Sequence, residues 1–143
     1  MKLSKAKIAN GEFNAWDDES QTHAMIAMVR DGISYGDFLK FFRNEPFTDQ
    51  EWANYLGISV RTLDRYRNGQ KRFPAKQSER ILEIKRLLTF GESVFEDRGN
   101  FMDWMCMRNI PMGGVLPKDL LDTTIGINMV QDQLGRIEHG ILA

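Results

Sequence analysis

A chain of 143 residues, 42% hydrophobic and 27% charged, is long enough for one hydrophobic core or two very small ones, and is too apolar to be a disordered protein. Its single cysteine and two histidines exclude a disulfide framework and a metal site, and we expect no cofactor. The sequence has no apolar run of about 18 residues and no signal peptide, which favours a cytoplasmic protein without membrane contact. The formal net charge of −1 excludes a uniformly basic protein, although residues 59–86, with nine Lys and Arg against three Asp and Glu, carry +6.

The first 20 residues are polar and aperiodic, and we interpret residues 1–20 as a loose N-terminal arm. A first helix is predicted from Ser20, with apolar residues at helical spacing, to a glycine stop at Gly32. Ser34 can cap a second helix, which must end before Pro46. The apolar side of this second helix is expected to consist of Phe38, Leu39, Phe41 and Phe42.

The pattern over residues 47–68 predicts two short helices joined by a sharp turn. Thr48 and Glu51 have the spacing of a capping box. Gly57 stands where a helix ends with a positive φ, and Ser59 can cap the next helix. The side chains that must then point into a core are Trp52, Leu56, Ile58, Leu63 and Tyr66. This arrangement is typical of a helix-turn-helix, which binds DNA through its second helix.

The +6 segment begins at this second helix. Solvated charged helix faces and plain packing of two short helices are common, but the motif and the charge together favour DNA binding. Arg can donate two hydrogen bonds to guanine and Thr can contact a thymine methyl group, so we expect Arg61, Thr62 and Arg65 to read bases. Phosphate contacts are expected from Ser59 and from the cations beyond Gly69, which are Lys71, Arg72 and Lys76. The candidate DNA-binding residues are Ser59, Arg61, Thr62, Arg65, Arg67, Lys71 and Arg72.

A longer helix is predicted over residues 74–95, followed by a turn at residues 96–100. We therefore place the domain boundary there, with a helix-turn-helix domain at residues 21–95 and a C-terminal domain at residues 96–143. The long helix closes the core or extends into a homodimer interface, because helix-turn-helix proteins usually bind two half-sites as dimers. Its apolar stripe consists of Ile81, Leu82, Ile84, Leu87 and Leu88.

The C-terminal segment predicts a short helix over residues 101–107, a loop, a helix start at Pro117 and a last helix capped by Thr123. The elements together predict an all-α protein. The apolar side of the last helix is Ile127, Val130, Leu134 and Ile137. Its polar side is Asn128, Asp132, Gln133, Arg136 and His139.

No group of residues in the chain has the arrangement of a catalytic site, so we expect no enzyme. His139 adjoins Glu138, but adjacent helical residues point in different directions. Cys106 is interpreted as a buried small hydrophobe. Four methionines favour core filling over an adaptable interface, without excluding it: Met102, Met105, Met107 and Met112.

Several C-terminal motifs resemble a known family. The run NIPMGGVLP at residues 109–117, LLDT at residues 120–123 and LGRIEHG at residues 134–140 resemble the toxin-binding domain of Xre/MbcA/ParS-type antitoxins. The segment from Gly36 to about Phe95 is similar to the Xre-like helix-turn-helix domain that precedes it in that family. The resemblance covers about residues 25–143 and implies a type II toxin–antitoxin role.

The resemblance further implies that the antitoxin represses its own operon, and that its C-terminal region blocks the active site of a RES-domain toxin that uses NAD. A homodimer within a larger toxin–antitoxin complex is expected. Arg136 suits a site that normally holds pyrophosphate, but it could equally pair with Asp132 on its own helix. The alternative is a stand-alone regulator whose C-terminal segment only dimerises it. The candidate toxin-binding residues are Arg136, Ile137, Glu138, His139, Ile141 and Leu142.

Overall fold

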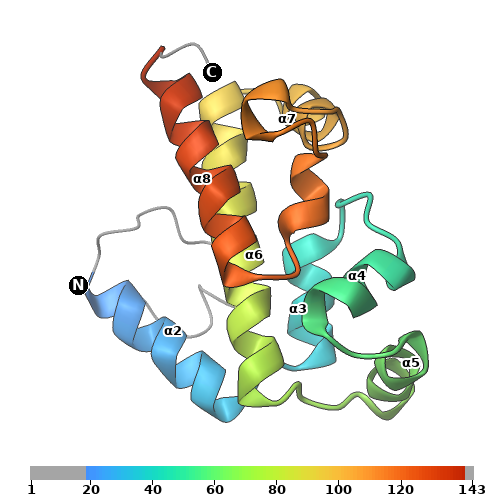
Figure 1. The fold of residues 1–143 in the computed structure, drawn as a ribbon. Coiled ribbons are helices and arrows are strands. Elements are labelled where there is room, and N and C mark those ends of the chain that lie inside the picture. Colours follow the sequence, from blue (N-terminus) through green and yellow to red (C-terminus); the bar gives the residue numbers. More distant parts are fainter. Residues whose placement is uncertain (1–18, 141–143) are drawn as a thin grey trace. The chain divides into compact units, whose positions relative to one another are not determined.

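The computed structural model describes residues 19–140, and these residues confirm the all-α fold (Figure 1). The expected N-terminal arm falls outside the described residues, except for its last two positions. The α-helices are α2 (Glu19–Asp31), α3 (Tyr35–Phe42), α4 (Asp49–Leu56), α5 (Val60–Gly69), α6 (Ala75–Phe95), α7 (Arg98–Met105) and α8 (Thr124–Glu138). Two short 3-10 helices, η1 (Ile110–Met112) and η2 (Pro117–Leu120), precede α8.

The chain divides into two compact units at Lys85 and Arg86, inside α6. The first unit contains α2 to α5 and the start of α6, and the second contains the rest of the chain. The sequence places the domain boundary at the end of α6 instead. That end is marked by Glu96, which has a positive φ of 55°. The boundary at residues 95–96 stays a prediction for the functional domains.

The helix ends of the first unit follow the expected capping chemistry. The Ser34 hydroxyl accepts a hydrogen bond from the Asp37 amide at 3.1 Å. Thr48 and Glu51 form the reciprocal bonds of a capping box, both at 3.1 Å. Gly57 ends α4 in the left-handed region with φ of 68°. The pattern of capping residues therefore locates the starts of α3 and α4 and the sharp turn after α4.

An aromatic cluster forms the core of the first unit. The Phe38 ring lies edge-on to the rings of Trp52 and Phe73, with centroids 5.0 and 5.4 Å apart. Phe42 lies 4.3 Å from Trp52. These contacts tie α3 to α4 and to the segment that follows α5. One expectation is wrong, because Leu39 is 50% exposed and does not belong to the apolar side of α3.

Backbone hydrogen bonds attach the segment after α5 to the segment before α3. Ser34 and Arg72 form an isolated antiparallel bridge. The Tyr35 amide donates to the Lys71 carbonyl at 3.0 Å, and the Phe73 amide donates to the Ile33 carbonyl at 2.7 Å. The cations that follow α5 are thus held on a fixed backbone.

The second unit is built around α7, α8 and the end of α6. Asp97 caps α7 by accepting a hydrogen bond from the Asn100 amide at 2.8 Å, so α7 begins three residues before the expected start at Phe101. Gly91 on α6 contacts the Phe101 ring so closely that a β-carbon would overlap it. Gly126 on α8 lies against the Leu120 carbonyl in the same way.

Three expectations about side chains in the second unit change. Cys106 is exposed and not a buried hydrophobe. Gln133 is 2% exposed and so does not belong to the polar side of α8. The methionines divide, because Met105 is fully buried whereas Met107 is 63% exposed. Among the described residues, no helix is long and apolar enough to cross a bilayer.

Candidate functional sites

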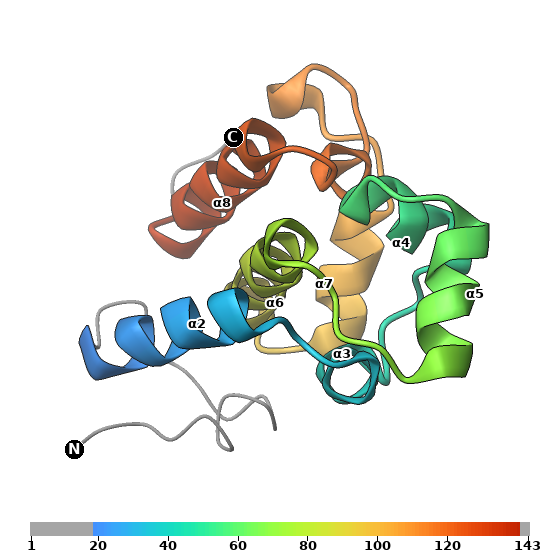
Figure 2. The same cartoon turned by 90° about the horizontal axis from the view of Figure 1, so that it is seen from below.

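Helices α4 and α5 form the predicted helix-turn-helix, and they contact each other across the turn at Gly57 (Figure 2). The small side chain of Ala53 is 1% exposed and lets the helices approach. Trp52, Leu56 and Leu63 are buried as expected, whereas Ile58 and Tyr66 are half-buried. Leu63 is the one fully buried residue of α5, so most of that helix presents its side chains to solvent.

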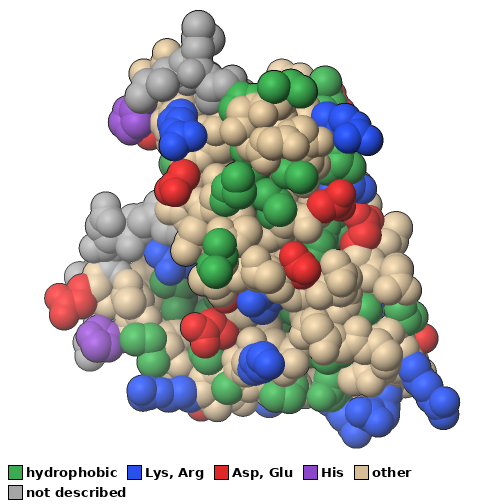
Figure 3. Space-filling model, in the orientation of Figure 1, with side chains coloured by type: hydrophobic (Ala, Val, Ile, Leu, Met, Phe, Trp, Pro, Cys, Tyr) green, Lys and Arg blue, Asp and Glu red, His purple; other side chains and the backbone are tan. Residues whose placement is uncertain are grey.

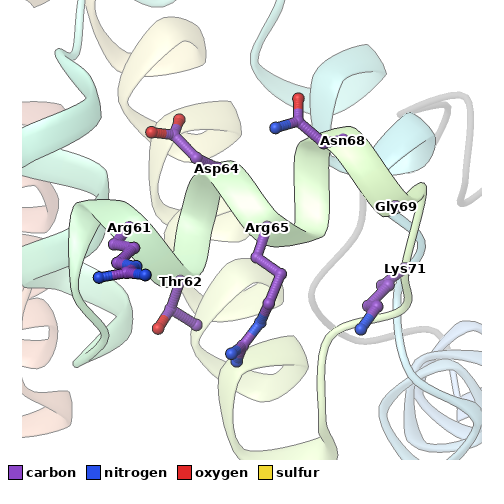
Figure 4. Close-up of a pocket in the computed structure, with 7 residues that line it drawn as sticks. All are labelled: Arg61, Thr62, Asp64, Arg65, Asn68, Gly69 and Lys71. Carbon is purple, nitrogen blue, oxygen red and sulfur yellow. The ribbon is translucent and has the colours of Figure 1, made fainter.

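A shallow hollow of about 660 Å³ lies on the exposed side of α5. In Figure 4, Thr62, Arg65 and Lys71 extend to one side of the helix, whereas Asp64 and Asn68 extend to the other. Four of the seven sequence-predicted DNA-binding residues come together at this surface. Its lining residues are Arg61, Thr62, Asp64, Arg65, Asn68, Gly69 and Lys71.

Three cations of this surface have free side chains. Within residues 19–140, Arg61, Arg65 and Lys71 form no side-chain hydrogen bond and no ion pair. In Figure 3, Lys and Arg side chains lie at the lower right, where Figure 1 shows α5, and others are scattered over the rest of this face. Guanidinium and ammonium groups without internal partners can donate all their hydrogen bonds to an anionic ligand. The surface is therefore suited to a polyanion.

Ser59 has a structural task at the start of α5. Its hydroxyl accepts from the Thr62 amide and donates to the Thr62 hydroxyl, both at 3.0 Å. This cap fixes the first turn of α5 and orients Thr62. Ser59 is exposed, so the cap lies at the solvent-facing edge of the turn.

Unlike the free cations, Arg67 and Arg72 donate hydrogen bonds to other groups of the protein. The Arg67 guanidinium donates to the Tyr35 hydroxyl at 2.8 Å and to the carboxylates of Asp49 and Asp64 at 2.9 and 3.0 Å. These hydrogen bonds, first the one to Tyr35 and then the one to Asp49, raise the pKa of Arg67 above its ordinary value. Arg72 donates to the Gly32 carbonyl at 2.8 Å.

Sequence reasoning did not include Asn68 and Asp64 among the site residues. Asn68 follows Arg61 and Arg65 at spacings of seven and three, so helical periodicity places its backbone beside theirs, although its side chain extends to the other side of the helix from Arg65 in Figure 4. The sequence pattern places the end of the second helix at residue 68. The helix in fact extends through Gly69, and the left-handed residue that ends it is Gln70, with φ of 50°.

A second hollow, of about 400 Å³, lies in the second unit beside the end of α8. It brings together Arg136 and His139, two of the sequence-predicted toxin-binding residues. The Arg136 guanidinium donates to the Gln133 side chain at 3.4 Å and, within the described residues, forms no ion pair with Asp132. The residues that line this hollow are Phe90, Gln131, Asp132, Gly135, Arg136 and His139.

The other predicted toxin-binding residues are distributed unevenly. Glu138 is exposed and Ile137 is half-buried, so Ile137 contributes to packing as well as to the surface. Ile141 and Leu142 lie outside the described residues. Phe90 was missed, because it lies far away in sequence and no local pattern connects α6 with the end of α8.

Comparison with protein families matches both parts of the chain. Residues 24–86 match the antitoxin Xre-like helix-turn-helix domain. Residues 91–140 match the antitoxin Xre/MbcA/ParS C-terminal toxin-binding domain. The first match contains the α5 surface, and the second contains the end of α8.

Curated relatives agree with these matches. An antitoxin Xre of Photorhabdus laumondii subsp. laumondii is 34% identical over 103 residues, which cover 66% of this chain and 70% of that protein. An antitoxin Xre of Yersinia enterocolitica is 35% identical over 88 residues, covering 61% and 60% of the two chains. A protein of Sphingobium sp. called Prs ADP-ribosylating antitoxin is 24% identical over 127 residues, covering 82% and 80%.

Proposed function

Because the chain belongs to the Xre family of antitoxins, with an Xre-like helix-turn-helix domain and an Xre/MbcA/ParS toxin-binding domain, we propose that it has two activities. Its C-terminal domain neutralises a RES-domain toxin that uses NAD. Its helix-turn-helix binds operator DNA and represses transcription of its own operon. The protein acts in the cytoplasm as a homodimer within a larger toxin–antitoxin complex.

The free cations of α5 are the observation that carries the DNA-binding proposal. Arg61 and Arg65 are exposed on the second helix of the motif, which is the helix that enters the major groove in proteins of this type. Each guanidinium can donate two hydrogen bonds to guanine O6 and N7. Thr62, fixed by the Ser59 cap, offers a methyl group to thymine. These residues would supply the sequence preference.

Phosphate contacts would come from the edges of the same surface. Lys71 is exposed and its ammonium group is free within the described residues. Its backbone is fixed by the bond from Tyr35, so the charge is held close to α5. Arg72 spends one donor on the Gly32 carbonyl and keeps others for a phosphate. Such contacts orient the protein on DNA without selecting a sequence.

The end of α8 supports the proposal for toxin binding. Arg136 and His139 line an open hollow, and Glu138 is exposed beside them. An arginine suits a site that ordinarily holds the pyrophosphate of NAD. The name of the Sphingobium relative includes ADP-ribosylation, a reaction that takes its ADP-ribose from NAD. Insertion of the α8 end would then exclude NAD from the toxin.

Co-expression tests the toxin partner. The chain and the protein encoded beside it are produced together in one cell, and growth and cellular NAD are measured. We expect the neighbouring protein alone to stop growth and deplete NAD, and the chain to restore both. If the neighbouring protein is not a RES-domain protein, or if growth is not restored, the toxin-binding part of the proposal is wrong and a stand-alone regulator that dimerises through its C-terminal segment becomes the better account.

A further inference from the structure

Arg67 connects the three helices of the helix-turn-helix region. It belongs to α5, and its guanidinium bonds Asp64 on the same helix, Asp49 in the first turn of α4 and Tyr35 in the first turn of α3. Its charged group also lies 5.7 Å from the centre of the Tyr35 ring. One side chain thus uses all three nitrogens of its guanidinium on partners from three helices.

The packing of α5 makes this connection important. Leu63 is the only side chain of α5 that is fully buried, and Tyr66 is half-buried with its ring 5.1 Å from that of Phe73, so few apolar contacts restrain the rotation of the helix about its axis. Arg67 lies one turn beyond Leu63. The planar guanidinium holds its three partners in a fixed geometry, which a flexible ammonium group does not. Arg67 is thus placed to restrain the direction in which Arg61 and Arg65 point.

The charges around Arg67 also indicate that it acts within the protein. Asp64 lines the candidate DNA surface, and its carboxylate would repel phosphates. Arg67 pairs with Asp64 at 3.0 Å and with Asp49 at 2.9 Å, so its positive charge is shared between two partly exposed carboxylates. Three of its five N–H donors are bonded within the protein and its charge is offset by two carboxylates, so Arg67 has less to offer to DNA than Arg61 or Arg65.

We infer that Arg67 is a positioning residue that sets the orientation of α5 against DNA, and that it does not contact DNA itself. This inference rests on the proposed DNA binding. It replaces the sequence-based expectation that Arg67 is a DNA-contacting residue like Arg61 and Arg65.

Binding of two DNA duplexes by the full chain tests the inference. One duplex carries the DNA directly upstream of its own coding sequence, and the other is a scrambled sequence of equal composition. The variants are Arg67→Lys, Arg67→Met and Asp49→Asn. Affinities are measured over a range of salt concentrations, and circular dichroism monitors folding.

A positioning role predicts that Arg67→Lys and Arg67→Met both reduce the preference for the upstream duplex, by about tenfold if one bidentate base contact is misplaced. The slope of log affinity against log salt should not change. A phosphate contact predicts instead that Lys restores binding and that Met lowers the slope by about 0.9. Rescue by Lys, or a lower slope in Met, would overturn the inference.

Asp49→Asn tests the inference without changing Arg67, because a charge effect and a positioning effect of Asp49 predict opposite changes in DNA binding. Loss of an anion near DNA should tighten binding to both duplexes if Asp49 acts only through its charge. If Asp49 holds Arg67, the preference for the upstream duplex falls. The matched control is Glu79→Gln, which removes one exposed carboxylate from α6 and should leave the preference unchanged. If the wild-type chain does not distinguish the duplexes, the proposed function fails. If the wild-type chain distinguishes the duplexes and Asp49→Asn keeps the full preference, the positioning role fails but the proposed DNA binding does not.

Discussion

The arginines of α5 differ in what their guanidinium groups contact. Arg61 and Arg65 are free within the described residues, whereas Arg67 is bonded to three partners. The sequence places all three on one basic helix and so predicts DNA contact for each. It cannot separate them, because Asp49 is 18 residues from Arg67 and Tyr35 is 32 residues away. Only the fold brings these side chains together.

Arg61→Ala and Arg65→Ala should each reduce the preference for operator DNA over scrambled DNA by about 1–3 kcal/mol, because each removes a bidentate base contact. The measurement is a pair of binding titrations with the two duplexes. Lys71→Ala is the control, since loss of a phosphate contact should weaken both duplexes and flatten the salt dependence. Equal weakening of both duplexes by the arginine variants would mean that they touch phosphates and not bases.

At the scale of single elements, the starts and ends of helices are predicted best by local capping patterns. The capping box at Thr48, the positive φ at Gly57 and the cap at Thr123 all follow from short-range patterns that the sequence displays. The start of α7 was missed because Asp97 looked like a turn residue, although it caps the helix. The burial of Gln133 was also missed, since helical periodicity does not record which neighbours cover a polar side chain.

Two glycines of α8 should respond to the same substitution in opposite ways. Gly126→Ala places a β-carbon against the Leu120 backbone, which cannot move away as a side-chain end could. It should lower the free energy of unfolding by about 1–3 kcal/mol. Gly135→Ala meets no atom within 4 Å. It should raise the free energy of unfolding by about 0.5–1 kcal/mol, because alanine favours the helix.

Urea denaturation of the full chain, followed by circular dichroism, measures both glycine variants. The matched pair removes the general effect of adding a methyl group to α8. If Gly126→Ala is as stable as Gly135→Ala, the close approach of α8 to η2 is not the reason for a glycine at position 126.

At the scale of the whole molecule, the two candidate sites belong to different compact units. The α5 surface lies before Lys85, and the hollow beside α8 lies after Arg86. The basic segment and the C-terminal motifs of the sequence predict that DNA binding and toxin binding belong to separate domains. It could not predict where α6 divides between the units, because the apolar stripe of that helix is continuous from Ile81 to Leu88.

Separate units should give separable activities, and this is the central claim. Deletion from Asp132 onward would be a poor test, since it removes Leu134, which is fully buried. Arg136→Glu changes an exposed side chain of the hollow and reverses its charge. Arg108→Glu is the matched control, because Arg108 is an exposed arginine of the same unit outside the hollow.

The most direct measurement is growth of cells that co-express the toxin with each variant, together with the affinity of each variant for operator DNA. The account predicts that Arg136→Glu loses neutralisation by at least tenfold, as expected for a buried charge-paired contact, and keeps its operator affinity. Arg108→Glu should keep both activities. Full neutralisation by Arg136→Glu, or a parallel loss of DNA binding, would contradict it.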